Sequence, residues 1–188
     1  MKNLSLHNVA SVNHLTWPQA PQDVTIESPA LMVVTDFSQH VPLVVNHQMR
    51  AVEAEAAMRR QHVRLKFVVD DHEEFLGVVG LEDLNDEEIL KKVASGFERS
   101  ELSVSDFMCP RRFLYALDYA ELEQTQIHTL LEALGGYKRQ HCLVVDGQPQ
   151  RIRGIVSASD VARKIKLPLD LSVTVSFQRV WRVLNRAV

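Results

Sequence analysis

The hydrophobic and polar positions of this chain follow the same order twice. Residues 64–84 read RLKFVVDDHEEFLGVVGLEDL, and residues 139–161 read RQHCLVVDGQPQRIRGIVSASDV. Both stretches contain the triplet Val-Val-Asp, followed at matching distances by a glycine (Gly77 and Gly154) and by an aspartate (Asp83 and Asp160). Such internal self-similarity predicts two copies of one supersecondary unit.

Each copy predicts a helix, two strands joined by a polar turn, and a second helix. The apolar runs predict strands over 67–69 and 75–79 in the first copy and over 142–145 and 152–156 in the second. Helices are predicted ahead of these strands, over 49–60 and 119–134, and Gly135-Gly136 ends the second of them. A short apolar phrase opens each copy, at 34–37 and 104–107. Because one unit leaves a face of its small sheet uncovered, we expect the two copies to pack sheet to sheet.

The segments that flank the repeats differ from them in pattern. Residues 1–29 contain Pro18, Pro21 and Pro29 without a helical or strand period, which predicts a partly irregular extension. We divide the remainder into a first repeat (30–100), a second repeat (101–168) and a C-terminal capping helix (169–188).

In that last helix the apolar residues share one face and three arginines share the other: Phe177, Val180, Trp181 and Leu184, against Arg179, Arg182 and Arg186. The apolar face is expected to pack on the module or on a second copy. The alternative is contact of the arginines with an acidic partner or nucleic acid.

Composition and charge narrow the class of function. The 188 residues are 46% hydrophobic and 24% charged with a formal net charge of −3, which is ordinary for a soluble protein and gives no general attraction to nucleic acid or to an anionic membrane. Cys109 and Cys142 form no paired motif, the first residues lack the apolar core of a signal peptide, and no apolar run could span a bilayer, so we expect a cytoplasmic protein. No metal-ligand spacing and no nucleophile or phosphate-loop motif is present, so neither a metal site nor an enzyme is predicted.

The most informative motif is Gly-Ile-Val-Ser-Ala-Ser-Asp at 154–160, where a strand gives way to a helix. Ser157 and Asp160 have the spacing of a capping box, in which the hydroxyl and the carboxylate each accept a free backbone N–H. The same groups suit a ligand, because the hydroxyl can donate to a phosphate and the carboxylate can accept from a ribose diol. Both interpretations remain open from the spacing alone.

The paired Val-Val-Asp strands, each followed by glycine, a hydroxyl position and an aspartate, resemble the CBS domain family over about residues 30–165. The resemblance implies an α+β fold in which tandem β-α-β-β-α repeats form one pseudo-two-fold module, here with a short C-terminal helix. It implies a regulatory homodimer, not an enzyme, with clefts that bind AMP, ADP, ATP or a related adenosyl ligand such as S-adenosylmethionine. By position, the family's phosphate- or ribose-binding hydroxyl is Ser157 and its ribose-binding carboxylate is Asp160. An unidentified protein partner would receive the signal, and the alternative is a ligand-free dimerisation or scaffold protein.

The first copy departs from the motif, because Gly80 occupies the hydroxyl position. Glycine can begin a helix, but it cannot make the side-chain hydrogen bond, whose loss costs about 0.5–3 kcal/mol. Asp83 remains a candidate ribose ligand, yet we expect at most one competent site, built around Ser157 and Asp160. Arg139 is the preferred phosphate ligand, since it precedes the strand that faces the cleft in the family. The other basic residues considered are Lys138, Arg151, Arg153, Arg111 and Arg112.

Overall fold

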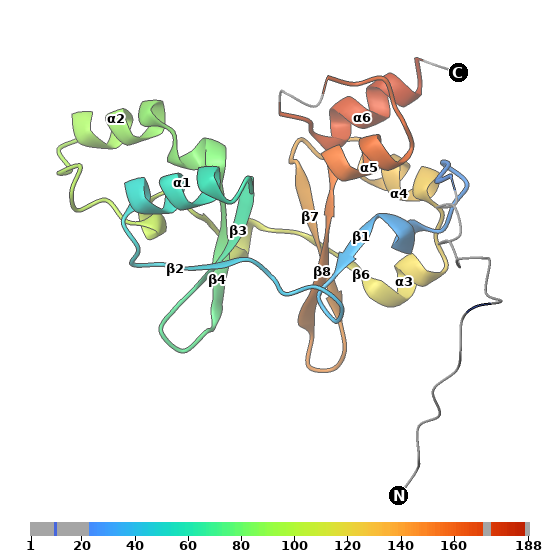
Figure 1. Ribbon diagram of the computed structural model, residues 1–188, viewed down its shortest axis with the longest axis horizontal. Coiled ribbons are helices and arrows are strands. Elements are labelled where there is room, and N and C mark those ends of the chain that lie inside the picture. The colour runs from blue at the N-terminus through green and yellow to red at the C-terminus, as the bar shows by residue number, and fades with distance from the viewer. Residues whose placement is uncertain (1–9, 11–22, 171–173, 187–188) are drawn as a thin grey trace, which may run out of the picture.

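The computed structural model describes Ala10, residues 23–170 and residues 174–186, and its strands form two four-stranded sheets (Figure 1). The first sheet has the order β1-β8-β7-β6, and its strands are β1 (Val34–Asp36), β6 (Ala116–Asp118), β7 (His141–Asp146) and β8 (Arg151–Ser157). The second has the order β2-β3-β4-β5, with β2 (Val44–Asn46), β3 (Leu65–Val69), β4 (Phe75–Gly80) and β5 (Cys109–Pro110). The predicted α+β class is confirmed.

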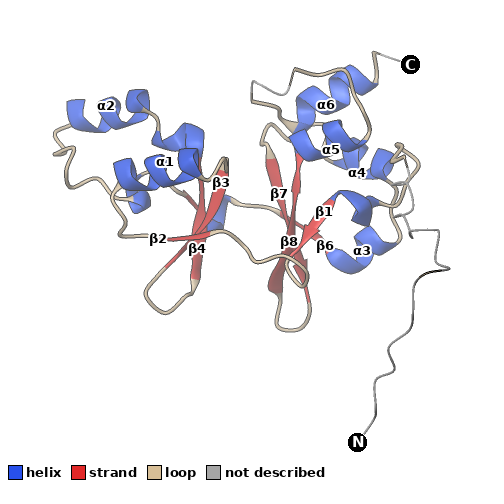
Figure 2. Cartoon of the chain, viewed as in Figure 1, coloured by secondary structure: helices blue, strands red, loops and turns tan. Residues whose placement is uncertain are grey.

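The helices gather beside the two sheets, α1 and α2 next to the second sheet and α3 to α6 next to the first (Figure 2). The α-helices are α1 (Ala51–Arg60), α2 (Asp86–Ala94), α3 (Tyr119–Glu123), α4 (Ile127–Ala133), α5 (Ala158–Lys164) and α6 (Phe177–Leu184). Short 3-10 helices occur at η1 (Ala30–Val33), η2 (Leu81–Leu84), η3 (Val104–Asp106) and η4 (Arg111–Phe113). No helix in the described part of the chain is long and apolar enough to cross a membrane.

The strand that opens each repeat lies in the sheet of the other repeat. β1 pairs antiparallel with β8, and β5 pairs antiparallel with β4. The repeated glycine allows this exchange, because a side chain would obstruct the incoming strand: a Cβ at Gly154 would lie 2.6 Å from the carbonyl oxygen of Thr35, and one at Gly77 would overlap the carbonyl oxygen of Cys109. The glycine of the motif therefore serves the fold.

Three apolar clusters hold the module together. One lies under α4 to α6 and another under α1 and η2. The third joins the two sheets through Phe67, Val78 and Leu143, which is the sheet-to-sheet packing that the repeats predicted. The strand exchange extends to the cores, because Ala30 and Val33 are buried in the core of the second repeat while Leu102 and Val104 are buried in that of the first. The division between residues 100 and 101 stays a sequence-based prediction.

The single helix predicted over 119–134 is wrong, because the chain is interrupted between α3 and α4. The incoming N-terminal segment takes hydrogen bonds at the break: the N–H groups of Ile127 and His128 donate to the carbonyl oxygens of Ser28 (2.9 Å) and Ile26 (2.8 Å). Residues 23–29 of the predicted extension thus lie against the second repeat, while 1–9 and 11–22 fall outside the described residues.

α6 packs by its apolar face. Phe177, Val180 and Leu184 are buried in the core of the second repeat, and Trp181 lies against Gly135, where a Cβ would come within 2.6 Å of the indole ring. Gly135 is therefore required by this close approach, and the exposed arginines occupy the outer face.

Candidate functional site

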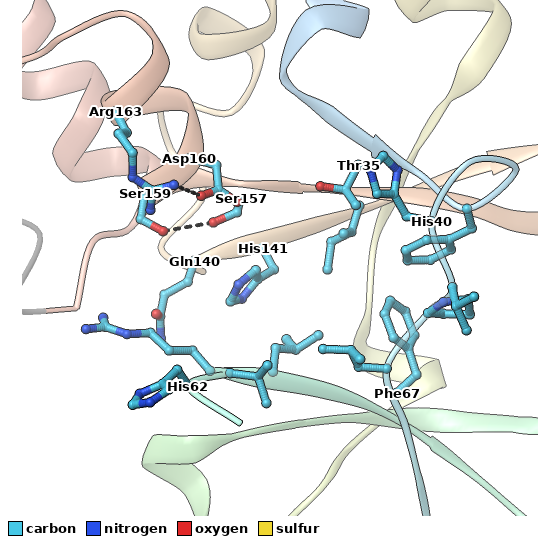
Figure 3. Close-up of a pocket in the computed structure, with 18 residues that line it drawn as sticks. Thr35, His40, His62, Phe67, Gln140, His141, Ser157, Ser159, Asp160 and Arg163 are labelled. Carbon is cyan, nitrogen blue, oxygen red and sulfur yellow. Dashed lines mark hydrogen bonds and ion pairs between the residues drawn. The ribbon is translucent and has the colours of Figure 1, made fainter. Parts of the chain in front are cut away.

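A cavity of about 550 Å³ opens between the two repeats (Figure 3). One wall is the loop from β1 to β2, and a second is the segment of the first repeat that leads into β3. The third wall belongs to the second repeat and consists of the start of β7, the end of β8 and the start of α5. Because its walls come from both repeats, the cavity exists only in the assembled pair.

Ser157 and Asp160 lie on the third wall, as the ligand interpretation requires. Ser157 is the N-cap residue of α5, but its side chain makes no capping hydrogen bond. Its Oγ lies 2.9 Å from Oγ of Ser159, and the Asp160 carboxylate pairs with the Arg163 guanidinium at 2.8 Å. The capping-box interpretation of this motif is wrong, and both residues line the cavity.

The matching groups of the first repeat are engaged elsewhere. The backbone N–H of Gly80 donates to Oδ2 of Asp83 at 2.8 Å, so this carboxylate stabilises its own turn. Burial raises the pKa of Asp83, although the Gly80 N–H and the positive charge of Arg139 oppose that shift. Asp83 and Arg139 thus lie near each other, and neither lines the cavity that holds Ser157 and Asp160. As site residues, the four stay a prediction.

The other basic residues considered from the sequence are also away from this cavity. Arg153 lies near the opposite end of β8 from Ser157 and pairs with Asp36 at 2.7 Å. The arginines that do line the cavity are Arg64 and Arg163, which the sequence interpretation did not select. Arg64 occupies the position in the first repeat that Gln140 occupies in the second, and both line the cavity, so the pseudo-symmetry of the repeats is the signal that identifies it.

The two ends of the cavity differ in polarity. Figure 3 shows Ser157, Ser159, Asp160 and Arg163 together at one end, with Thr35, His40 and Phe67 at the other. At the second end the rings of Phe37 and Phe67 meet edge to face, with centroids 5.2 Å apart, and the loop residues beside them are Val41, Pro42 and Leu43. One end therefore offers hydrogen bonds and charge, and the other offers apolar and aromatic surface.

His141 and Gln140 lie between these ends, at the start of β7. Burial lowers the pKa of His141 to about 4, with Arg64 acting in the same direction and Asp160 opposing it. The imidazole is therefore neutral near pH 7. Gln140 donates through Nε2 to Oε1 of Glu82, which links the cavity wall to the first repeat.

The family model for the CBS domain matches residues 34–89. No protein with a curated description matches the sequence. An uncharacterized conserved protein from Pyrococcus horikoshii is similar in structure, with a TM-score of 0.55 and 19% identity over 78% of this chain and 98% of that one. A CBS domain protein of unknown function from Thermoplasma acidophilum has a TM-score of 0.50 and 17% identity over 81% and 77% of the two chains.

A third similar structure is the CBS domain of a bacterial CNNM/CorC family Mg²⁺ transporter in complex with ATP. Its TM-score is 0.50, with 19% identity over 75% of this chain and 89% of that chain. At these identities the structures establish the fold, and the family model establishes the domain. Residues 34–89 therefore match a CBS domain, and the two repeats together adopt the fold of a CBS pair.

Proposed function

We propose that this protein is a regulatory module that binds one adenine nucleotide in the cavity between its repeats and signals to a protein partner. The observation that carries the proposal is a cavity of about 550 Å³ between the repeats, whose lining includes Ser157, Asp160, Arg64 and Arg163 and whose other end is aromatic. Sites for small ligands have this size and this mixture of apolar walls and few polar groups. The ATP bound to the related transporter domain supports the choice of ligand class.

The polarity of the cavity assigns a role to each end. The adenine ring would occupy the apolar end beside Phe37 and Phe67, where aromatic and aliphatic surface replaces water. The ribose hydroxyls would donate to Asp160, because a carboxylate only accepts. The phosphate would accept hydrogen bonds from Ser157, Arg64 and Arg163.

Binding would rearrange one ion pair. Asp160 pairs with Arg163 in the free protein, and both side chains are more than a third exposed. Exposed pairs of this kind contribute about 0–1 kcal/mol, so releasing the guanidinium to a phosphate costs little.

A matched pair of aspartate variants tests the site. Isothermal titration with AMP, ADP, ATP and S-adenosylmethionine should give one site per chain for at least one of them. Asp160→Asn should weaken that ligand by about tenfold or more, since hydrogen bonds to charged groups contribute about 1.5–3 kcal/mol. Asp83→Asn, at the equivalent position of the first repeat, should leave the affinity within about twofold, because Asp83 caps its own turn.

The absence of heat with all four ligands on folded protein would overturn the proposal. Two equal sites per chain, or equal losses in the two variants, would contradict the assignment to one cavity.

A ligand-free scaffold is the second candidate, favoured by Gly80 and by the engagement of Asp83 in its own turn. Both functions include a homodimer in the cytoplasm, without catalysis, membrane association or nucleic-acid binding. Sedimentation of wild type and of a Ser157→Ala, Asp160→Ala variant, with and without nucleotide, separates them. A scaffold sediments as an unchanged dimer in every case. For a sensor, nucleotide changes the sedimentation coefficient of wild type but not that of the double variant.

A further inference from the structure

We propose that His141 takes up a proton when a phosphate-bearing ligand enters the cavity, so that the affinity of this site rises as the pH falls. The inference rests on the proposed function and adds a form of regulation to the same site. It assigns a role to a side chain that the ligand contacts proposed above do not use.

The position of His141 places its ring in the path of the ligand. His141 is paired with Ser157 in the register of β7 and β8, so the two residues are direct cross-strand neighbours. Both line the cavity. Figure 3 shows the imidazole projecting into the cavity below Ser157 and Asp160 and above His62.

Charged groups of both repeats face this ring. Asp160 on α5 favours its protonated form, and Arg64, which precedes β3, opposes it. The other titratable or charged residues that line the same cavity are His40, His62 and Arg163, and His40 lies at the opposite end from Ser157 and Asp160. In the free protein, burial lowers the pKa of His141 more than Asp160 raises it, and the pKa is about 4.

A phosphate group changes this balance in one direction. It brings negative charge beside a buried ring and accepts hydrogen bonds, and both effects favour imidazolium over imidazole. The pKa of His141 is then higher with ligand than without it. By linkage, binding strengthens as the pH falls through the bound-state pKa and stops strengthening below the free-state pKa. Adenosine, which has no phosphate, should bind without this dependence.

The test measures the affinity of the full chain for AMP at about pH 7.5, 6.5 and 5.5, across the range in which histidine switches charge. Wild type is compared with His141→Gln and with His62→Asn. The second is a matched control at the exposed rim of the cavity, where the backbone is left-handed (φ 55°) and asparagine is tolerated. The phosphate of AMP itself titrates at about pH 6. Only the differences in pH dependence between the variants are therefore interpreted.

We expect the affinity of wild type and of His62→Asn to rise about three- to tenfold more over this range than that of His141→Gln. Nuclear magnetic resonance titration of the histidine rings should show one ring, missing in His141→Gln, whose pKa rises on saturation with AMP. Equal pH slopes in wild type and His141→Gln overturn the proton linkage alone, and so does a slope lost in His62→Asn instead. Failure of AMP, ADP and ATP to bind wild type at every pH overturns the nucleotide site itself and this inference with it.

Discussion

The carboxylate of Asp36 accepts two hydrogen bonds from the guanidinium of Arg153, at 2.7 Å from Nε and 3.1 Å from Nη2, across 117 positions of the sequence. Arg153 also lies over the ring of Tyr119, 4.6 Å from its centroid, and donates to Asp146 at 3.2 Å. This network fixes the end of β1 to β8 of the second repeat, so Arg153 stabilises the exchanged strand.

Replacing Asp36 by asparagine should destabilise the protein in a pH-dependent way. Arg153 holds the pKa of Asp36 well below its usual value of 3.8. A carboxyl whose folded-state pKa is depressed stabilises the fold above its unfolded-state pKa and loses that contribution as the pH falls through the folded-state value. The urea midpoint of Asp36→Asn should therefore lie below that of wild type at neutral pH, and the two midpoints should converge as the pH is lowered below 3.8. A difference that stays constant through this acid range contradicts the assignment.

Adding one methyl group at Gly154 should weaken the strand exchange. The new Cβ would lie 2.6 Å from the Thr35 carbonyl oxygen, a backbone atom that cannot turn aside. We expect Gly154→Ala to lower the free energy of unfolding by about 1–3 kcal/mol, the usual range for overpacking. Gly136→Ala is the control, because nothing lies within 4 Å of its Cβ position. Equal urea midpoints for the two variants would show that close strand contact does not explain why both copies have glycine at this position.

Truncating Phe177 should show that α6 is part of the core of the second repeat. Phe177 is fully buried, and replacing a buried phenylalanine by alanine costs about 3–5 kcal/mol. Arg182→Ala, on the exposed face of the same helix, should change stability by less than about 0.5 kcal/mol. Chemical denaturation of both variants measures this contrast, and a small effect of Phe177→Ala would mean that α6 is dispensable.

The thiol of Cys142 should be unreactive in the native protein. Burial raises its pKa to about 12, and its Sγ lies 3.8 Å from the carbonyl oxygen of Tyr115. Because the thiolate is the reactive form, iodoacetamide at about pH 8 should leave Cys142 unmodified in a Cys109→Ser variant and modify it in urea. Mass spectrometry reads the outcome, and rapid native labelling would contradict the buried position.

The repeated sequence predicted the fold well where the signal was local. The apolar runs indicated β3, β4, β7 and β8, and the glycine and aspartate aligned the two copies. The pairing of β1 and β5 was not predicted. Strands of two or three residues contain no usable period, and their partner strands are distant in the sequence. The break between α3 and α4 was missed because the N-terminal segment causes it.

The candidate site was predictable only in the half that the second repeat provides. Ser157 and Asp160 followed from the motif, and both line the cavity. Arg64 and His141 required knowledge of how one repeat faces the other. Arg139 was selected by its place next to a strand, but the structure places it near Asp83 and outside the residues that line this cavity.

The exchange of opening strands also sets an order of events during synthesis. Asp36 and Arg153 are 117 positions apart, so at roughly 5–20 residues per second the ribosome makes the second about 6–23 s after the first. β5 ends at Pro110, so the second sheet has all its strands well before β8 is made. During that interval β1 has no partner strand, and the half-made chain presents a completed first core beside an unpaired segment. The last strand to emerge therefore completes the module, and truncation before β8 removes the strand that joins β1 to β7 in the first sheet.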